Sequence, residues 1–409
     1  MRLKRRSICV LQIKDEQKLD FDRFFRGELA LRTVVQCRLV CALTGEEMSL
    51  EAQDLPLIAC VHAHAWSDLA EVSRGDAEIA ARLRDLAERG VLLSDPPSST
   101  RPLLHRRESA LEGVWWDDWA RIYHARSCWR DVTTSQPLCG GSLETVDQMS
   151  EKRGSAPAHF SHRASAAEGV DLALPDACDP WLTQLQGRRT VRTFRTETAL
   201  PLASLAYVLH VVYGAQGLCK VSPDLSVIRR TSPSAGAMHP IEAYVLAIHV
   251  DALRPGLYHH ESDTHRLRVI ETMDRSQARD VALRFVARQD YFADAHALII
   301  QVARFDRGFW KYPRDSKAYG SVLLDAGHLS QTHYLTAERQ GLGAFFTSAI
   351  NDGDIADRLG LDTAREAAVG INGLGIPGHP EAALHLQTAP FIIERSNPEG
   401  IACSPIARP

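Results

Sequence analysis

Apolar residues in the first hundred positions recur at helical spacing and then change to a short apolar run. One helical pattern follows Asp76 and ends at Gly90, a residue suited to a helix C-terminus. Ser67 and Asp68 can cap a shorter helix before it. The run "VLLSD" after Gly90 is typical of a strand. Helix, turn, helix and strand predict a winged-helix-like domain over residues 1–100.

The second half of the chain contains apolar residues at helical spacing in some segments and strand-like apolar runs in others. Helical patterns occupy "LASLAYVLHVVYG" and "YGSVLLDAGHLSQTHYLTAERQG". Strand-like runs are "EAYVLAIHV", "GLYHH", "HRLRVIE", "HALIIQVARF" and "AAVGING". Helices or long connections separate these strands, which predicts an α+β domain over residues 180–395 with a sheet covered by helices on both faces. The expected fold is therefore a three-layer α-β-α arrangement.

The segment between these two parts is less regular. In "WWDDWARIYHARSCW", residues 115–129, the side chains of Trp115, Trp119, Ile122 and Tyr123 share one helical face. We expect this stripe to be buried against a neighbouring element, with a cofactor or substrate wall as the alternative. Ser, Gly, Pro, Thr and Ala dominate residues 132–176 without a period, which is typical of a linker or long loop. Residues 101–179 are thus predicted to be a helical connector and linker, and residues 396–409 a C-terminal tail.

Composition narrows the possible partners. The chain has 409 residues, enough for two domains, with 45% hydrophobic residues, 24% charged residues and a net charge of -4. This balance lacks the basic excess of a nucleic-acid binder. No run of eighteen apolar residues occurs, so we expect a cytoplasmic protein without membrane contact. For the N-terminal domain three roles stay open: a packing domain, a domain that recognises a leader peptide, or a DNA reader.

The nine cysteines favour neither disulfides nor a metal centre. Their number is odd and no Cys-x-x-Cys pair is present. Cys37 and Cys41 could meet across one helical turn as metal ligands, but no second pair lies nearby, and we interpret both as core thiols. No metal is expected.

Three separate segments have the residue types of a cofactor site. In "GRRTVRTF", Arg188, Thr190 and Arg192 could converge on a phosphate if the segment opens the following helix; a solvated basic face is the alternative. The small residues Pro233, Ser234, Ala235 and Gly236 would let a flat ring approach the main chain and its free N–H groups.

The third segment, "QGLGAFF", places Gly341, Leu342 and Gly343 between a helix and a strand. It lacks the third glycine of a dinucleotide-binding fingerprint. Together the three segments indicate a planar cofactor with a phosphate tail, and flavin mononucleotide (FMN) fits this description.

These motifs also resemble those of a known protein family. The region of about 181–378 resembles the nitroreductase superfamily, and within it the SagB-type dehydrogenases that oxidise ribosomally made peptides. The matching motifs, in order, are "RRTVRTF", "PLASLAYVLHVVYG", "SPSAGAMHPIEAYV", "GLYHH", "LLDAGHLSQ" and "GLGA". The layout including the N-terminal part is similar to peptide maturation dehydrogenases. The sequence departs from the family pattern at Thr190, usually Ser, and at Asp325, usually Glu, which puts a contact of that carboxylate in doubt.

The resemblance implies an FMN-dependent fold that forms homodimers, with the flavin bound where two protomers meet. By position, Arg188, Thr190 and Arg192 would hold the phosphate and ribityl chain. The residues expected around the flavin ring are Pro233, Ser234, Ala235, Gly236, Met238, Gly341, Leu342 and Gly343.

The resemblance further implies a proton-transfer pair, Lys311 and Tyr312, in "FWKYPRDSKAYG". Removing hydrogen from a saturated ring requires a hydride acceptor and a base. An amine with an ordinary pKa of about 10.4 becomes a base only when burial or a neighbouring cation such as Arg314 lowers that pKa. Lys317 is the alternative base, and His239 beside the small-residue turn is expected to be structural.

The sequence thus predicts an FMN-dependent dehydrogenase that converts azolines to azoles in a precursor peptide, passing electrons to oxygen, with a peptide-modifying enzyme as a further partner. Two alternatives stay open: an NAD(P)H-dependent nitroreductase or quinone reductase, and a flavin-free scaffold subunit of a peptide-maturation complex.

Overall fold

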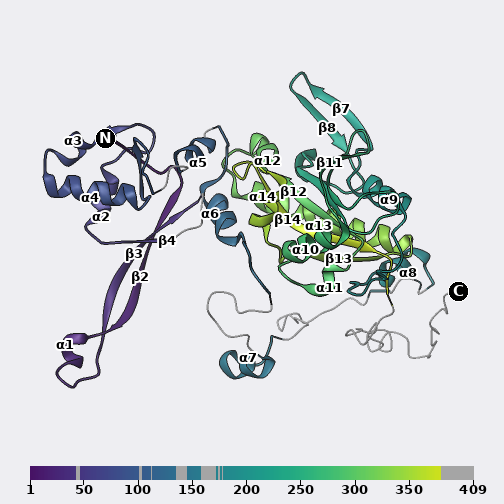
Figure 1. Cartoon of the computed structure of the whole chain (residues 1–409), viewed down its shortest axis with the longest axis horizontal. Helices are drawn as coiled ribbons and strands as arrows, with labels where there is room; N and C mark the ends of the chain where they lie inside the picture. Colours follow the sequence, from purple (N-terminus) through teal and green to yellow (C-terminus); the bar gives the residue numbers. More distant parts are fainter. Residues whose placement is uncertain are drawn as a thin grey trace.

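The computed structural model describes residues 1–42, 47–100, 104–111, 113–134, 145–157, 172–173, 176 and 178–378. Most of the predicted linker and the entire predicted C-terminal tail lie outside these ranges. The described elements form an N-terminal region and a C-terminal region (Figure 1). Among the described residues, the N-terminal region has one large buried apolar cluster and the C-terminal region has two.

The described residues before position 96 form two small antiparallel sheets and four helices. Its elements are β1 (Arg2–Arg5), β2 (Cys9–Leu19), α1 (Phe21–Phe24), β3 (Leu31–Cys41), β4 (Glu47–Leu50), α2 (Asp54–Ala59), β5 (Ser67–Asp68), α3 (Leu69–Ser73), α4 (Ala77–Glu88) and β6 (Leu92–Asp95). The strand orders are β5-β1-β6 and β2-β3-β4.

The predicted helix, turn, helix and strand are present at α3, α4 and β6. Asp68 and Asp76 cap the two helices as expected, each accepting hydrogen bonds from main-chain N–H groups of the first turn. Gly90 follows α4 with φ 80°. The long hairpin of β2 and β3, which extends from the body in Figure 1, was not predicted.

The interpretation of Cys37 and Cys41 as core thiols is confirmed. Cys37 and Cys41 are buried core residues, as expected. They lie on strand β3 and not on a helix, because "TVVQCRLVC" alternates and contains β-branched residues that favour an extended backbone.

The connector links the two regions through α5 (Leu104–Ala110) and α6 (Asp118–Ser127), with α7 (Val146–Arg153) further along. In the N-terminal region the buried Arg6 donates from Nε to Glu108 of α5 over 2.9 Å. In the C-terminal region Trp116 packs on Phe305 and Phe309, and its indole N–H donates to the carbonyl oxygen of Ala364 over 2.7 Å. The connector therefore contacts both cores.

The predicted aromatic stripe of the connector is wrong in its orientation. Trp115, Trp119 and Tyr123 are 52%, 66% and 62% exposed, whereas Trp116 and Ile122 are buried. The indole of Trp116, which precedes helix α6, has a carbonyl partner in the core, whereas the buried side of the helix itself carries Ala120, Ile122 and His124.

The C-terminal region is a three-layer α+β structure, as predicted. Its helices are α8 (Pro180–Gly187), α9 (Leu202–Tyr213), α10 (Arg275–Phe285), α11 (Asp290–Ala293), α12 (Phe305–Lys311), α13 (Ser316–Arg339) and α14 (Asp352–Leu359). Its strands are β7 (Gly217–Ser222), β8 (Leu225–Arg229), β9 (Ile241–Ala247), β10 (Gly256–Glu261), β11 (Arg266–Thr272), β12 (Ala297–Arg304), β13 (Gly343–Thr347) and β14 (Glu366–Gly375). Strands β7 and β8 form a separate hairpin.

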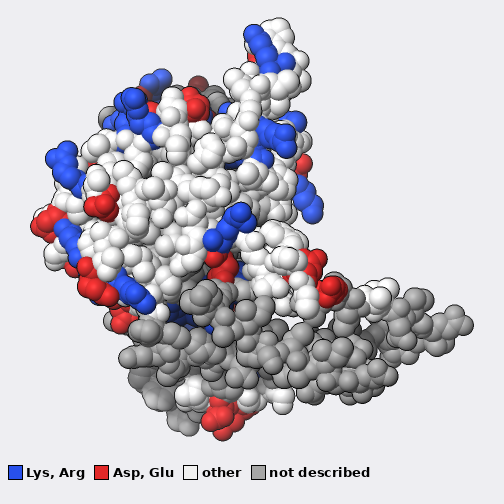
Figure 2. Space-filling model, turned by 90° about the vertical axis from the view of Figure 1, so that its right-hand side faces the viewer, with Lys and Arg blue, Asp and Glu red and all other residues white. Residues whose placement is uncertain are grey.

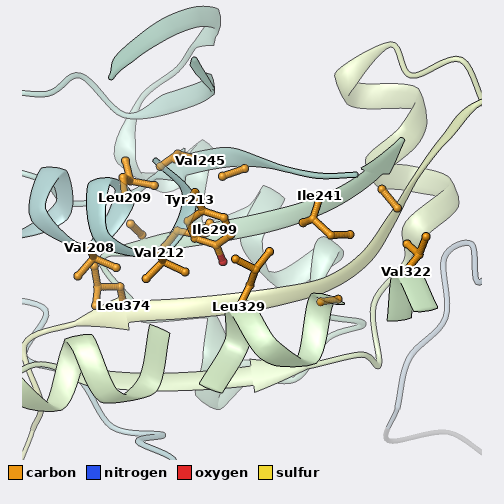
Figure 3. Packing of buried hydrophobic residues seen from close by; sticks show 14 of the residues in the cluster. Val208, Leu209, Val212, Tyr213, Ile241, Val245, Ile299, Val322, Leu329 and Leu374 are labelled. Carbon is orange, nitrogen blue, oxygen red and sulfur yellow. The ribbon is translucent and has the colours of Figure 1, made fainter. Parts of the chain in front are cut away.

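The central sheet has the order β11-β10-β9-β12-β14-β13 and is antiparallel throughout. Alternate residues of each inner strand face opposite layers. Val245 and Ile299 pack with α9 and α13, as Figure 3 shows. Leu246 and Ile300 pack with α10, α11 and α14 on the other face. The long helix α13 thus lies against the sheet, where its outer side can carry a site.

A polar network is buried between α9, α13 and the sheet. The amide groups of Gln301 and Asn372 donate to the hydroxyl of Tyr213 over 3.3 and 3.0 Å. Ser330 of α13 donates to Asn372 over 2.9 Å. These bonds fix the position of α13 relative to β12 and β14.

Candidate active site

The small-residue turn at Pro233–Gly236 is held by helix α13. The hydroxyl of Ser234 donates to one oxygen of Asp325 over 2.5 Å, and the N–H of Ala235 donates to the other over 3.2 Å. Ser234 Oγ also accepts from the N–H of His239 over 2.9 Å. The contact that the change from Glu to Asp put in doubt is therefore made, and burial raises the pKa of Asp325.

Gly236 has a left-handed backbone with φ 59° inside the short 3₁₀ segment Ala235–Ala237. This conformation strains any residue with a Cβ. Its carbonyl oxygen accepts a hydrogen bond from the ammonium group of Lys311 over 2.9 Å. A Cβ at Gly236 would lie 2.5 Å from the hydroxyl of Tyr312 and 2.7 Å from Lys311 Nζ. The structure thus brings the predicted pair directly onto the predicted turn.

Lys311 ends helix α12, and Tyr312 leaves the helix with φ -126° and ψ 67°. Tyr312 is half-buried, but Lys311 is exposed, so the burial expected around its amine is not found. The guanidinium of Arg314 lies over the ring of Trp115, 5.6 Å from its centre. Lys317 is exposed in the first turn of α13.

His239 lies beside the turn with its imidazole half-buried. Burial, together with the charges of Arg230 and Arg307, lowers the pKa of His239 to about 4. The imidazole is therefore neutral near pH 7.

The second group of predicted residues surrounds Tyr334, further along α13. The hydroxyls of Thr190 and Tyr334 are 3.1 Å apart, and the guanidinium of Arg188 lies over the Tyr334 ring at 5.3 Å. The N–H of Phe346 donates to the same tyrosine hydroxyl over 2.8 Å. Sequence reasoning missed Tyr334; an aromatic residue on the long helix nine positions after Asp325 was the available signal.

The segment carrying Arg188 does not open a helix, so the condition under which its arginines would converge at a helix start is not met. Helix α8 ends at Gly187, and the chain then runs extended, with the N–H of Val191 donating to Ala344 over 2.8 Å. The next helix, α9, begins only at Leu202. The β-branched residues Thr190 and Val191 favour this extended backbone. Any anion here would therefore be held by the side chains and not by a helix N-terminus.

Gly341, Leu342 and Gly343 connect α13 to β13 as predicted. Gly341 has φ 66° with open space around a Cβ position. At Gly343 a Cβ would lie 2.7 Å from the side chain of Val191. The group that comes close to Gly343 is therefore Val191 of the extended segment after α8.

Both groups lie along one helix. Asp325 holds the turn and Tyr334 touches the arginine segment; nine residues of helix separate them by about 13 Å. Arg192 is exposed. Neither Arg188 nor Arg192 has an acidic partner among the residues described, and the guanidinium of Arg188 over the Tyr334 ring, next to the hydroxyls of Thr190 and Tyr334, suits a phosphate monoester. The residues present therefore fit the phosphate end of FMN.

Two further observations concern metals and membranes. Within the ranges given above, no three His, Cys, Asp or Glu side chains are arranged to hold a metal ion. In the same ranges, none of the helices is both long and apolar enough to cross a bilayer.

Comparison with known proteins places this site in a family. The model described as "Nitroreductase family" matches residues 185–376. The trifolitoxin-processing protein TfxB of Rhizobium leguminosarum bv. trifolii is 30% identical over 309 residues, covering 71% of this chain and 78% of that protein. A nitroreductase-family protein of Methanocaldococcus jannaschii is 28% identical over 191 residues, covering 46% of this chain and 89% of that protein.

Solved structures show weaker likeness. The E. coli microcin synthetase McbBCD complex with truncated pro-MccB17 matches with TM-score 0.46 and 15% identity, covering 64% of this chain and 94% of that one. A nitroreductase-family structure from Anabaena variabilis matches with TM-score 0.40 and 23% identity, covering 48% of this chain and 38% of that one. From the family model and the relative of which it spans more than two thirds, we conclude that the chain belongs to the nitroreductase family.

Proposed function

We propose that this protein is an FMN-dependent dehydrogenase that oxidises azoline rings to azoles in a ribosomally made precursor peptide. The observation that carries the proposal is the contact of Lys311 and Tyr312 with the turn at Gly236. A nitroreductase needs no amine and phenol at this place, whereas removal of a ring proton does. The similarity to a toxin-processing protein over most of the chain supports a peptide substrate.

The predicted site residues would bind the cofactor at its two ends. Arg188, Thr190 and Arg192 would hold the FMN phosphate and ribityl chain, and Pro233–Gly236, Met238 and Gly341–Gly343 would border the ring. When bound, FMN supplies an acceptor for the hydride and its two electrons, which pass on to oxygen.

Side chains of the protein would remove the proton. Oxidation of an azoline breaks two C–H bonds, one releasing hydride and the other a proton. Nζ of Lys311 would accept that proton, and the adjacent Tyr312 hydroxyl, beside the same turn, would orient the ring. The hydrogen bond to Gly236 holds the amine in place.

We further propose a homodimer with the flavin between two protomers. Leu323 and Leu324 on α13 are 40% and 67% exposed, although this helix carries both groups of site residues. The face shown in Figure 2 has a broad area without charged side chains and scattered charges of both signs around it. An uncharged surface of this kind suits contact with a second copy.

The N-terminal region would help to place the peptide, with a ring-forming enzyme as a further partner. Its helix α4 is poorly suited to DNA: Arg82 is engaged by Glu51 and Asp54. Arg89, at the end of α4, pairs with Asp85. These ion pairs leave little positive charge for phosphates.

The test combines flavin content and mass spectrometry. The purified protein is loaded with FMN and incubated in air with a synthetic peptide that contains one thiazoline ring. We expect one FMN per chain and a mass loss of about 2 Da per ring. A protein that takes up no FMN would instead be a scaffold, and an unchanged peptide would overturn the proposed reaction.

One alternative has its own support. The similarity to a nitroreductase-family protein over 191 residues favours an NAD(P)H-dependent nitroreductase or quinone reductase. Rapid bleaching of the bound flavin by NADPH without any peptide would identify that activity. Slow bleaching together with peptide oxidation would exclude it.

A further inference from the structure

A pocket of about 460 Å³ opens beside the small-residue turn. Five parts of the chain line it: the connector at Gly113–Trp115, the start of β8 with the turn before it, helix α12, and the single residues Met238 and Arg365. The lining residues are Gly113, Val114, Trp115, Asp224, Leu225, Ser226, Met238, Asp306, Arg307, Trp310 and Arg365. The β7–β8 hairpin that contributes to this wall extends from the body in Figure 1.

The pocket is next to the proposed proton-transfer pair. Trp310 immediately precedes Lys311, and the buried Met238 comes two residues after Gly236. The carbonyl oxygen of Trp115 accepts from the N–H of Arg314 over 3.0 Å. This hydrogen bond links the connector side of the pocket, Gly113–Trp115, to the segment that follows Tyr312.

The lining combines aromatic surface with a hydrogen-bond donor. Trp115 and Trp310 are 52% and 54% exposed, so their rings present large apolar faces to the pocket or to water. Arg307 is half-buried and donates from Nε to the carbonyl of Met238 over 2.9 Å. Within the described part of the chain its guanidinium has no ion-pair partner, so further N–H donors remain for a carbonyl group.

One wall of the pocket lies outside the family's shared region. The family model matches residues 185–376, whereas Gly113–Trp115 belong to the connector. A chain consisting of the matched region alone would lack this wall. The pocket is therefore a feature that the connector adds to the flavin-binding fold.

We propose that this pocket binds the peptide residue next to the ring being oxidised, and that it selects an aromatic side chain there. The proposal rests on the proposed function. The side chain would stack on Trp115 and Trp310, with the thioether of Met238 adapting to its shape. Arg307 would donate to a main-chain carbonyl of the same peptide, which fixes the distance from the pocket to the reacting ring.

The experiment measures kcat and KM of the FMN-loaded protein with synthetic peptides of one thiazoline ring preceded by a variable residue. That residue is Trp, Leu, Gly or Asp. The wild type should have a kcat/KM about tenfold higher for Trp than for Gly, mainly through KM. W115A and W310A should each remove most of this preference. Their kcat/KM for the Gly peptide should stay within about twofold of the wild-type value.

Trp119→Ala is the matched control. Trp119 is also on the connector and 66% exposed, but it is not among the lining residues. Its replacement should therefore leave kcat/KM unchanged for both the Trp and the Gly peptide. A wild-type preference of less than about twofold between Trp and Gly would overturn the pocket assignment without any variant. Equal loss on both peptides in W115A and W310A would also overturn it, because a purely structural effect does not depend on the substrate. A wild type that oxidises none of the peptides would reject the proposed function itself.

Discussion

The ammonium group of Lys311 donates a hydrogen bond of 2.9 Å to the main-chain oxygen of Gly236, 75 positions earlier in the chain. The same glycine has a left-handed backbone, and because it lacks a Cβ it leaves room for the hydroxyl of Tyr312. One turn thus holds both members of the proposed proton-transfer pair, and the aspartate of α13 holds the turn.

Replacing Lys311 with Ala should abolish the mass loss of the thiazoline peptide while FMN stays bound. A positioned general base contributes about 100- to 10,000-fold to rate, and kcat should fall by this order. Mass spectrometry and flavin absorbance of the same sample measure both quantities. Lys317→Ala is the companion variant, and if it lost activity while Lys311→Ala kept it, the base would be Lys317.

Gly236→Ala should reduce kcat by displacing the pair. The new Cβ would overlap the hydroxyl of Tyr312 and the ammonium of Lys311, both ends of flexible side chains, so the fold survives while the pair moves. The positive φ adds a stability cost of about 1 kcal/mol. Gly360→Ala controls for this cost, since Gly360 has φ 67° with no atom within 4 Å of a Cβ. Comparable kcat values in the two variants would contradict the assignment.

Arg188→Ala should weaken FMN binding by about 10- to 100-fold, because a hydrogen bond to a charged group contributes about 1.5–3 kcal/mol. Titration of the apoprotein with FMN, followed by flavin fluorescence, gives the dissociation constant. Arg189→Ala removes the adjacent, exposed charge and should have a small effect. Equal weakening by both variants would indicate general electrostatic attraction and not a specific phosphate contact.

Asn372→Ala should lower the free energy of unfolding by at least about 1–3 kcal/mol. The change leaves the buried hydroxyls of Tyr213 and Ser330 each with one partner fewer. Urea unfolding measured by circular dichroism tests this loss. Gln331→Ala on the exposed side of α13 should stay within about 0.5 kcal/mol of the wild type. A neutral Asn372→Ala would show that the network adds nothing to stability.

His333 should make stability depend on pH between about 6.5 and 4. Burial lowers the pKa of this histidine from 6.5 to about 4, with a hydrogen bond to the carbonyl of Gly373 acting in the opposite direction. In this window the unfolded chain binds the proton and the folded chain does not, so the free energy of unfolding falls as the pH is lowered. Each pH unit corresponds to about 1.4 kcal/mol at most for this one group.

Urea unfolding at pH 7, 6, 5 and 4 measures the slope for the wild type and for His333→Gln, which keeps a donor for Gly373. The variant should show a shallower dependence. His64→Gln changes an exposed histidine and should retain the wild-type slope. Parallel curves for the wild type and His333→Gln would exclude His333 as the source.

Much of the C-terminal fold could be predicted because its signals are local. The five strand-like runs became β9, β10, β11, β12 and β14, and the two helical patterns became α9 and α13. Asp68 and Asp76 also cap their helices as predicted, since a cap depends only on the next few residues.

The errors come from interactions between distant segments. The arginine segment is extended and not the start of a helix, because its main chain pairs with Ala344. The connector buries Trp116 in place of Trp115 and Trp119, because Ala364 offers a partner for that indole. Neither partner lies near in the sequence.

The residue types of the site can be read from the order of amino acids alone: two arginines beside a hydroxyl, a turn without large side chains, and a lysine followed by a tyrosine. Tertiary packing determines which of these residues meet: it brings the lysine and tyrosine onto Gly236 and the arginine segment onto Tyr334 of α13. The reason is physical: composition and periodicity report the forces within a few residues of chain. The meeting of residues 75 positions apart depends on how α12, α13 and the sheet pack against one another.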